Sequence, residues 1–277
     1  MLSRPDVNRL LADHGLAPRR DLGQNFVADP NTVRRIARLA DVGPHDKVIE
    51  IGPGLGSLTL ALAETGARVR AVEVDRGIVP VLREVVAHHP NVDVIEADAM
   101  ELDWDEVLGG ETGWVLVANL PYNVATPLVC DILDGVPAVE RMLVMVQREV
   151  AERFCGSPRT PAYGAVSVKI AYWATARIAG TVPASVFVPR PKVESALASI
   201  TRRATPATDA DPEAMFSLVR TAFGQRRKML RRSLSDLVAP EVFAAAGIDA
   251  QRRPEELDVN EWGRLTNAWE AQRDADR

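Results

Sequence analysis

The chain has 277 residues, of which 47% are hydrophobic and 26% charged, and its net charge is −5 at pH 7. This length exceeds that of one typical domain and allows a sizeable core, so we do not expect a disordered protein. The negative charge argues against unselective coating of nucleic acid, which needs a wide positive surface, so any RNA contact must be local.

The cysteines and apolar segments indicate the compartment. Cys130 and Cys155 cannot form a disulfide framework, and neither stands in a cluster with metal-ligand spacing, so we expect no metal site. Residues 1–14 show no signal-peptide core, and apolar runs such as 142–146 are too short to cross a bilayer. We therefore expect a cytoplasmic protein with no membrane contact.

The predicted elements begin with a capped helix, in which Asp29 is the N-cap and Pro30 the first helical residue. Apolar runs and helical segments then alternate. The strands are expected at 48–51, 69–74, 92–95, 114–118 and 142–146, with helices up to 64, through 86, near 127–133 and from 148. Strands separated by helices predict an α/β protein with a mostly parallel, doubly wound, Rossmann-like sheet.

The second half of the chain departs from this alternation. Strands expected at 166–173 and 195–200 have no crossover helix between them, which predicts an antiparallel pair at the sheet edge. Residues 201–212 are small and polar without periodicity, as in a linker. We therefore predict a larger α/β domain over 1–204 and a small helical domain over 205–277.

A glycine-rich turn follows the first expected strand, in the sequence VIEIGPGLGS over 48–57. Gly52, Gly54 and Gly56 let the backbone approach a ligand at the carboxyl end of the sheet. The spacing is G-x-G-x-G, whereas dinucleotide binding requires G-x-G-x-x-G, so it favours S-adenosylmethionine and disfavours a dehydrogenase. The alternative is a tight turn that serves packing only.

Two acidic residues end the next strands. Glu73, about twenty residues past the turn, stands where an acidic side chain accepts hydrogen bonds from ribose hydroxyls. Asp98 follows the third strand, where a carboxylate can accept a bond from an adenine amine. Alternatively, Glu73 is a solvated strand end and Asp98 a helix N-cap.

The sequence NLPY at 119–122 directly follows the fourth strand. An adenine amine is a poor nucleophile because its lone pair is delocalised, and acceptors at the Asn119 side chain and at the Leu120 or Pro121 carbonyl would localise it. Tyr122 offers a stacking face for a base taken out of its helix. The alternative is an Asn-x-Pro turn that merely ends the strand.

Six segments occur in order along the chain: 22–26 (LGQNF), the glycine-rich turn, 73–75 (EVD), 98–100 (DAM), 119–122 (NLPY) and 187–195 (FVPRPKVES). Together they resemble the ribosomal RNA adenine dimethyltransferase family, in particular its bacterial KsgA-type members. The resemblance runs from about residue 21 to the last helical region. It implies two methyl transfers to each of two adjacent adenines near the 3′ end of small-subunit ribosomal RNA.

The resemblance also implies roles for individual residues. Asn25 and Val27, together with Gly52, would line the methionine side of the methyl donor. Glu73 would hold its ribose and Asp98 its adenine, and Asn119 would meet both donor and target. Most relatives have Leu where this chain has Val27, and a backbone contact would survive that change. Phe187 would sandwich the target base opposite Tyr122, although a Phe near two prolines also suits a core.

A basic segment is the best candidate for contact with the RNA backbone. On one predicted helix, Val219, Phe223, Leu230 and Leu234 share a stripe, and the cations fan across an adjoining face. The predicted RNA-binding residues are Arg226, Arg227, Lys228, Arg231 and Arg232. A solvated charged helix is the alternative reading.

We expect a monomer that binds small-subunit ribosomal RNA in an assembling ribosomal particle. Two alternatives remain open beside the disfavoured dehydrogenase. One is a large-subunit ribosomal RNA adenine methyltransferase of the antibiotic-resistance type, which shares these motifs. The other is a non-catalytic RNA-binding assembly factor that retains the fold, although the intact acceptor and donor-binding motifs speak against it.

Overall fold

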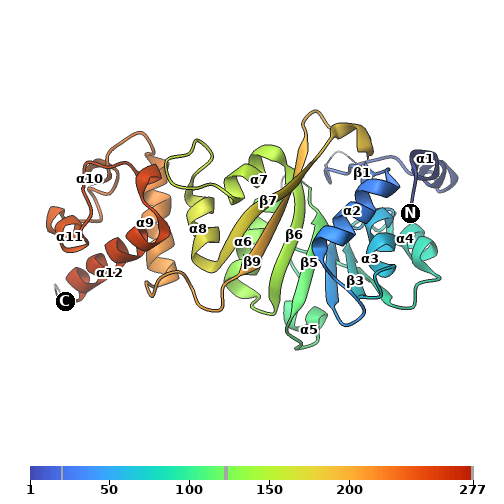
Figure 1. Cartoon of the computed structure of the whole chain (residues 1–277), viewed down its shortest axis with the longest axis horizontal. Coiled ribbons are helices and arrows are strands. Elements are labelled where there is room, and N and C mark those ends of the chain that lie inside the picture. Colours follow the sequence, from blue (N-terminus) through green and yellow to red (C-terminus); the bar gives the residue numbers. More distant parts are fainter. Residues whose placement is uncertain (20, 122–123, 276–277) are drawn as a thin grey trace. The chain divides into compact units, whose positions relative to one another are not determined.

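The computed structural model describes residues 1–19, 21–121 and 124–275 (Figure 1). The chain divides into two compact units. Unit 1 consists of Met1–Ala151 and Arg177–Arg202, and unit 2 of Glu152–Ala176 and Arg203–Arg277. The predicted boundary after residue 204 falls close to Arg203, but the sequence analysis placed 152–176 with the larger domain. The division into domains 1–204 and 205–277 stays a prediction.

Unit 1 is built on a mostly parallel sheet whose strands are β2 (Lys47–Ile51), β3 (Arg68–Glu73), β4 (Val92–Glu96), β5 (Trp114–Asn119), β6 (Val139–Gln147), β7 (Ala174–Val182) and β9 (Ser195–Arg202). Their order is β4-β3-β2-β5-β6-β9-β7. The strands from β4 to β6 are parallel, and β9 runs antiparallel to β6. The predicted doubly wound sheet with an antiparallel edge is confirmed.

The helices of this part are α1 (Arg4–Asp13), α2 (Pro30–Ala40), α3 (Ser57–Ala63), α4 (Val79–Val86), α5 (Trp104–Leu108), α6 (Ala125–Gly135) and α7 (Arg148–Phe154). Two short strands, β1 (Phe26–Val27) and β8 (Phe187–Val188), pair outside the main sheet, and η1 (Ala184–Val186) precedes β8. The predicted cap of α2 is present, because the Asp29 side chain accepts a hydrogen bond from the Thr32 N–H. The N-cap of α2 and the alternation of strands and helices could both be predicted from the local sequence.

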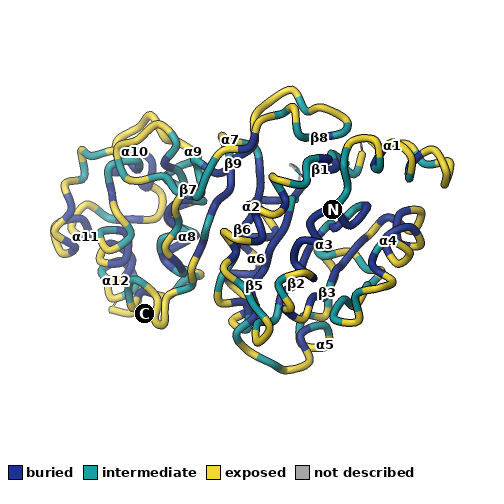
Figure 2. The backbone as a smooth tube through the Cα atoms, turned by 45° about the vertical axis from the view of Figure 1, so that its right-hand side comes forward, coloured by how far each residue is buried: buried dark blue, intermediate teal, exposed yellow. Residues whose placement is uncertain are grey.

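The core of unit 1 forms where α2 and α3 pack on one face of the sheet. Ile36 of α2 and Leu62 of α3 join Val48, Val115 and Leu143 of three neighbouring strands in one buried cluster. β2, β5 and β6 are accordingly dark along most of their length in the burial view (Figure 2). Burial on both faces explains why these strands read as continuous apolar runs.

Unit 2 is helical, with α8 (Ala165–Trp173), α9 (Pro212–Gly224), α10 (Leu230–Ser233), α11 (Pro240–Ala245), η2 (Pro254–Glu256) and α12 (Val259–Ala275). Its core gathers around the fully buried Trp262, with Met215 and Leu230 among its neighbours. No helix of the described residues is long and apolar enough to cross a membrane.

The expected strand over 166–173 is wrong, because this segment is helix α8. Its β-branched residues favoured a strand, but Val168 and Tyr172 lie one helical turn apart and both enter the core of unit 2. The Tyr172 hydroxyl also donates to the Ala210 carbonyl at 2.9 Å. Packing against distant residues therefore overrides local propensity, and the strand beside β9 is β7 instead.

The single helix expected across the basic segment is also wrong. α9 ends at Gly224, Gln225 has non-helical dihedral angles, and α10 starts only at Leu230. Glycine weakens a helix interior, and this one marks the break. The apolar stripe nevertheless survives: Leu230 and Leu234 are fully buried.

Candidate functional site

A cleft of about 280 Å³ opens in unit 1 at the carboxyl ends of β2, β3, β4 and β5. This is the edge of a doubly wound sheet at which ligands bind. Glu73, Asp98 and Asn119, which the sequence placed at three different strand ends, all line this one cleft. The predicted Asn25, Val27, Gly52 and Gly54 line it as well.

The glycine-rich turn between β2 and α3 lines the cleft with Gly52 and Gly54. Gly52, Gly54 and Gly56 all have positive φ, a conformation that costs other residues free energy. At Gly54 a Cβ would also lie 2.8 Å from the ring of Phe26. The turn thus needs glycine for its backbone angles and for close packing, and it exposes main-chain atoms to a ligand.

Glu73 is buried, and its carboxylate braces the turn. Oε2 accepts from the Gly54 N–H at 2.9 Å and Oε1 from the Asp75 N–H at 2.9 Å. Burial raises the pKa of Glu73 above its usual value, against the lowering effect of these two bonds. Each carboxylate oxygen can accept a second bond, so Glu73 can still receive a ribose hydroxyl.

Asp98, at the end of β4, is exposed at the cleft. Its Oδ1 accepts from the Met100 N–H at 2.9 Å, which fixes a tight turn after the strand. The second carboxylate oxygen is left for a ligand, so the turn-forming role and the adenine-binding role are compatible.

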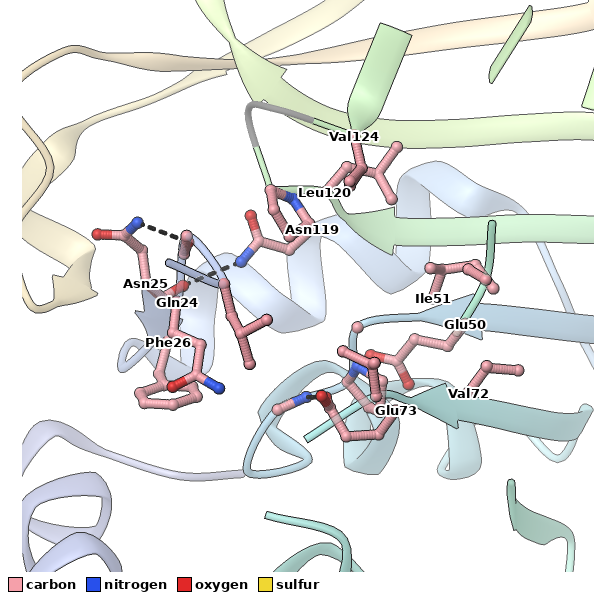
Figure 3. A pocket seen from close by; sticks show the side chains of 18 of the residues that line it. Gln24, Asn25, Phe26, Glu50, Ile51, Val72, Glu73, Asn119, Leu120 and Val124 are labelled. Carbon is pink, nitrogen blue, oxygen red and sulfur yellow. Dashed lines mark hydrogen bonds between the residues drawn. The ribbon is translucent and has the colours of Figure 1, made fainter. Parts of the chain in front are cut away.

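Asn119 ends β5 and is oriented by a neighbouring segment. Its Nδ2 donates to the Asn25 carbonyl at 3.0 Å (Figure 3). Because the donor end of the amide is engaged there, Oδ1 is the atom that can accept a hydrogen from a bound amine. Asn25 itself is held by a bond from its Nδ2 to the Gly23 carbonyl at 3.0 Å.

The two backbone carbonyls that follow differ in availability. The Pro121 carbonyl accepts from Val124 and Ala125 at 3.3 and 3.1 Å, where α6 begins. No hydrogen bond to the Leu120 carbonyl is found among the described residues. Of the two carbonyls that the sequence left open, Leu120 therefore has the freer acceptor. Tyr122 lies outside the described residues.

Phe187 and Val27 face each other in the short β1–β8 pair. Both are buried in the core cluster of unit 1, and both also line the cleft. Phe187 is only 1% exposed, so the core role weighed for it in the sequence is present. Because Phe187 also lines the cleft, its contact with the target base stays a prediction.

Three residues that the sequence analysis did not single out shape the same cleft. Gln24 donates to Asp75 Oδ2 at 2.7 Å and so ties the segment before β1 to the end of β3. Phe26 packs against the turn, as described above. Glu50 of β2 is fully buried and faces the cleft (Figure 3). Long-range packing, which local spacing does not encode, brings all three here.

The basic segment belongs to unit 2 and is exposed. Arg226 is engaged within its own unit, because its Nε lies 2.9 Å from Glu255 Oε2 and its Nη2 donates to the Pro161 carbonyl. The other four cations, none of which forms an ion pair with a described residue, are Arg227, Lys228, Arg231 and Arg232. These four are the ones free to meet phosphates.

The residues of the cleft fit S-adenosylmethionine. Carboxylates stand where ribose hydroxyls and an adenine amine would be held, and a glycine turn lets the main chain approach between them. The volume is near the lower end of small-molecule sites, roughly 300–1,000 Å³. Glu50 adds a buried carboxyl group beside the Thr59 hydroxyl of α3.

Two relatives share close to half of this sequence. Ribosomal RNA small subunit methyltransferase A of Kineococcus radiotolerans is 47% identical, over 96% of this chain and 90% of that protein. The protein of the same name from Thermobifida fusca is 45% identical, over 96% of this chain and 95% of its own.

Solved structures agree on the fold. A dimethyladenosine transferase from Plasmodium falciparum matches with a TM-score of 0.76 at 21% identity, over 88% of this chain and 97% of that one. The 23S rRNA methyltransferase ErmE matches with a TM-score of 0.69 at 27% identity, over 89% of this chain and 100% of that one. The family model for ribosomal RNA adenine dimethylase matches residues 15–271, and the chain belongs to this family.

Proposed function

We propose that this chain transfers methyl groups from S-adenosylmethionine to the N6 amines of two adjacent adenines near the 3′ end of small-subunit ribosomal RNA. Its family makes it an S-adenosylmethionine-dependent ribosomal RNA adenine dimethyltransferase. The small-subunit relatives, alike over nearly their whole length, support the choice of RNA. The observation that carries the proposal is Asn119, fixed by Asn25 in the same cleft as Glu73 and Asp98.

The proposed donor site spans three neighbouring strand ends. Asp98 accepts from the adenine amine, Glu73 from the ribose, and the turn at Gly52 and Gly54 provides main-chain contacts. Asn25 and Val27 line the methionine side. When bound, S-adenosylmethionine supplies an electrophilic methyl group on a sulfonium, and the chain supplies position and environment.

Asn119 and Leu120 act on the target amine. Asn119 Oδ1 and the Leu120 carbonyl accept its two hydrogens, which localises the nitrogen lone pair toward the methyl group. Holding the amine nitrogen in line with the methyl group and close to it supplies most of the acceleration, so a strong general base is not required. The Pro121 carbonyl begins α6 and thereby fixes the turn that presents both acceptors.

The target adenine reaches these acceptors only when it is flipped out of its stack. Phe187 provides an aromatic side chain in the cleft wall, and the proposal places Tyr122 on the other face of the base. An aromatic surface stabilises an unstacked base by about 1–3 kcal/mol. This offsets part of the free energy needed to take the base out of its helix.

The RNA backbone is proposed to meet the four free cations of unit 2, Arg227, Lys228, Arg231 and Arg232. Arg226 supports this segment through its pair with Glu255. The substrate in this proposal is an assembling small ribosomal subunit, bound by a monomer in the cytoplasm. The relatives, named as ribosomal RNA small subunit methyltransferases, support ribosomal RNA as the substrate.

Mass spectrometry of both ribosomal RNAs, from cells with and without the gene, tests the proposal. We expect two dimethylated adenines near the 3′ end of the small-subunit RNA, present only with the gene. Loss of methylation in the large-subunit RNA instead would favour the antibiotic-resistance type, to which the likeness to ErmE points. Unchanged methylation in both RNAs would contradict the enzyme assignment.

A further inference from the structure

Gln24 is a residue of the cleft for which the proposed reaction has no role yet. Its side-chain amide makes two hydrogen bonds: Nε2 donates to Asp75 Oδ2 at 2.7 Å, and Oε1 accepts from the Arg19 N–H at 2.8 Å. A carboxylate only accepts and a backbone N–H only donates, so an amide satisfies both partners at once. Glutamine therefore suits this place better than a carboxylate or a hydrocarbon chain.

Asp75 gives Gln24 a firm anchor. It is buried, and its Oδ1 accepts from the Gly77 N–H at 3.0 Å. Its carbonyl accepts from the Ile78 and Val79 N–H groups, where α4 begins. Hydrogen bonds to a carboxylate are among the strong ones in proteins. Gln24 is thus held to a residue that is itself fixed between the end of β3 and the start of α4.

The residue after Gln24 orients the proposed acceptor of the target amine. The Asn25 carbonyl accepts from Asn119 Nδ2 at 3.0 Å (Figure 3). The Asn25 side chain turns back to the Gly23 carbonyl at 3.0 Å, and β1 begins at Phe26. The Asn25 carbonyl therefore lies between two supports, the bond from Gln24 to Asp75 on one side and β1 on the other.

These contacts also reach the donor side of the cleft. The Asp75 N–H donates at 2.9 Å to Glu73, the proposed ribose acceptor. Hydrogen bonds thus link Glu73, through Asp75, Gln24 and Asn25, to Asn119, although Asn25 and Asn119 are 94 residues apart in the sequence. The residues proposed for the donor and for the target amine are held in one frame.

We propose that Gln24 is a positioning residue for methyl transfer, which acts through Asp75 and the Asn25 carbonyl on the direction of Asn119 Oδ1. The inference rests on the proposed function, because it requires Asn119 to accept a hydrogen of the target amine. Gln24 itself needs no contact with the amine or the methyl group. Misplacement of a reacting group by about 1 Å can cost on the order of 100-fold in rate, so loss of this support slows the transfer step.

Exchanging the amide and the carboxylate tests the role of Gln24. Gln24→Glu alone brings two carboxylates together. Asp75→Asn alone leaves two amides, which can bind each other only if one gives up its backbone partner. In the double variant Gln24→Glu, Asp75→Asn, the amide at position 75 can donate to the carboxylate at position 24. The Gly77 and Arg19 N–H groups then both keep an acceptor.

The readout is kcat for methyl transfer, with donor and small-subunit RNA saturating. We expect each single variant to lower kcat about tenfold or more, and the double variant to return it to within about threefold of the wild type. Asp93→Asn removes an exposed carboxylate outside the cleft and should leave kcat unchanged.

Gln24→Met separates positioning from a loss of donor binding. It removes both hydrogen bonds without adding charge, and it keeps the test valid if a charged variant does not fold. We expect a loss of about tenfold in kcat, while calorimetry shows the affinity for the demethylated donor, S-adenosylhomocysteine, changed by less than about threefold.

Three results would overturn the role of Gln24: wild-type kcat in the single variants, no recovery in the double variant, or equal losses of kcat and donor affinity in Gln24→Met. A wild-type chain that binds S-adenosylhomocysteine but transfers no methyl group to small-subunit RNA would instead contradict the proposed function.

Discussion

Asn119 takes its orientation from a backbone carbonyl in another part of the chain. Because its Nδ2 donates to the Asn25 carbonyl, the Oδ1 end of the amide is left to accept a hydrogen bond from the target amine. The sequence placed Asn119 and Glu73 at strand ends, and both line the cleft because neighbouring parallel strands end at one edge of the sheet. Their roles in binding and catalysis stay predictions. Glu50 was missed, since a glutamate inside a strand shows its burial only once α3 covers it.

Replacement of Asn119 by alanine should abolish methyl transfer while donor binding stays measurable. The substitution removes the side-chain acceptor for the amine but leaves Glu73, Asp98 and the glycine turn in place. We expect a loss of about 100-fold or more in transfer of labelled methyl groups to undermethylated small-subunit particles. Calorimetry with S-adenosylhomocysteine measures the retained binding.

Asn267→Ala, an equal truncation of an exposed residue on α12, is the matched control and should leave transfer unchanged. Full activity of Asn119→Ala would remove Asn119 from the mechanism.

Glu50 should also make the stability of the chain depend on pH. Its pKa is about 8 in the folded state against a usual 4.5, so between these values the folded state holds the extra proton. The free energy of unfolding then falls as pH rises, by about 1.4 kcal/mol per pH unit within that window. Glu50→Gln lacks this loss, so its stability relative to the wild type should rise from pH 5 to pH 8. Urea unfolding at several pH values measures this difference, and parallel curves for the two proteins would contradict it.

At the scale of elements, the turn between β2 and α3 shows which local signals are dependable. Its glycines were predictable from the sequence because most other residue types adopt a positive φ only at a cost in free energy, and Gly54 has the added constraint of the Phe26 ring. Two segments, 166–173 and 223–234, were misjudged. In the first, packing outweighed β-branched propensity, and in the second a helix break at Gly224 was not recognised.

Gly54→Ala should therefore weaken both the fold and donor binding. A Cβ at this position combines a positive φ of 56° with a contact of 2.8 Å to Phe26, so the turn or the ring must shift. We expect a loss of about 1–3 kcal/mol in unfolding free energy and a weaker affinity for S-adenosylhomocysteine. Gly43→Ala is the control, because a Cβ there meets open space. Equal stability of the two variants would show that the turn adapts freely.

At the scale of the whole molecule, the proposed function assigns methyl transfer and RNA attachment to different parts of the chain. The donor cleft is lined by residues of unit 1, while the free cations of the basic segment belong to unit 2. With a net charge of −5, the chain cannot rely on overall attraction to RNA, so a local cluster has to supply it.

The double variant Arg231→Gln, Arg232→Gln should weaken binding to small-subunit RNA in a salt-dependent way. Loss of two phosphate contacts reduces the slope of log K against log salt by about 1.4 to 1.8. Binding measured over a salt series gives this slope. The double variant Arg34→Gln, Arg38→Gln removes the same charge from the exposed side of α2 and should leave the slope unchanged. Identical slopes for wild type and the first variant would exclude this segment from the interface.

The N-terminal helix contributes to one wall of the cleft from outside the residues that the family model matches. Val7 of α1 lines the cleft, and Arg4 donates to the Ser185 and Phe187 carbonyls at 2.5 and 3.1 Å, whereas the family match begins at residue 15. A substitution in α1 can thus reshape this wall of the cleft without changing any of the residues proposed to act on the target amine. Such a substitution is expected to alter the affinity for the methyl donor while the acceptors at Asn119 and Leu120 stay in place.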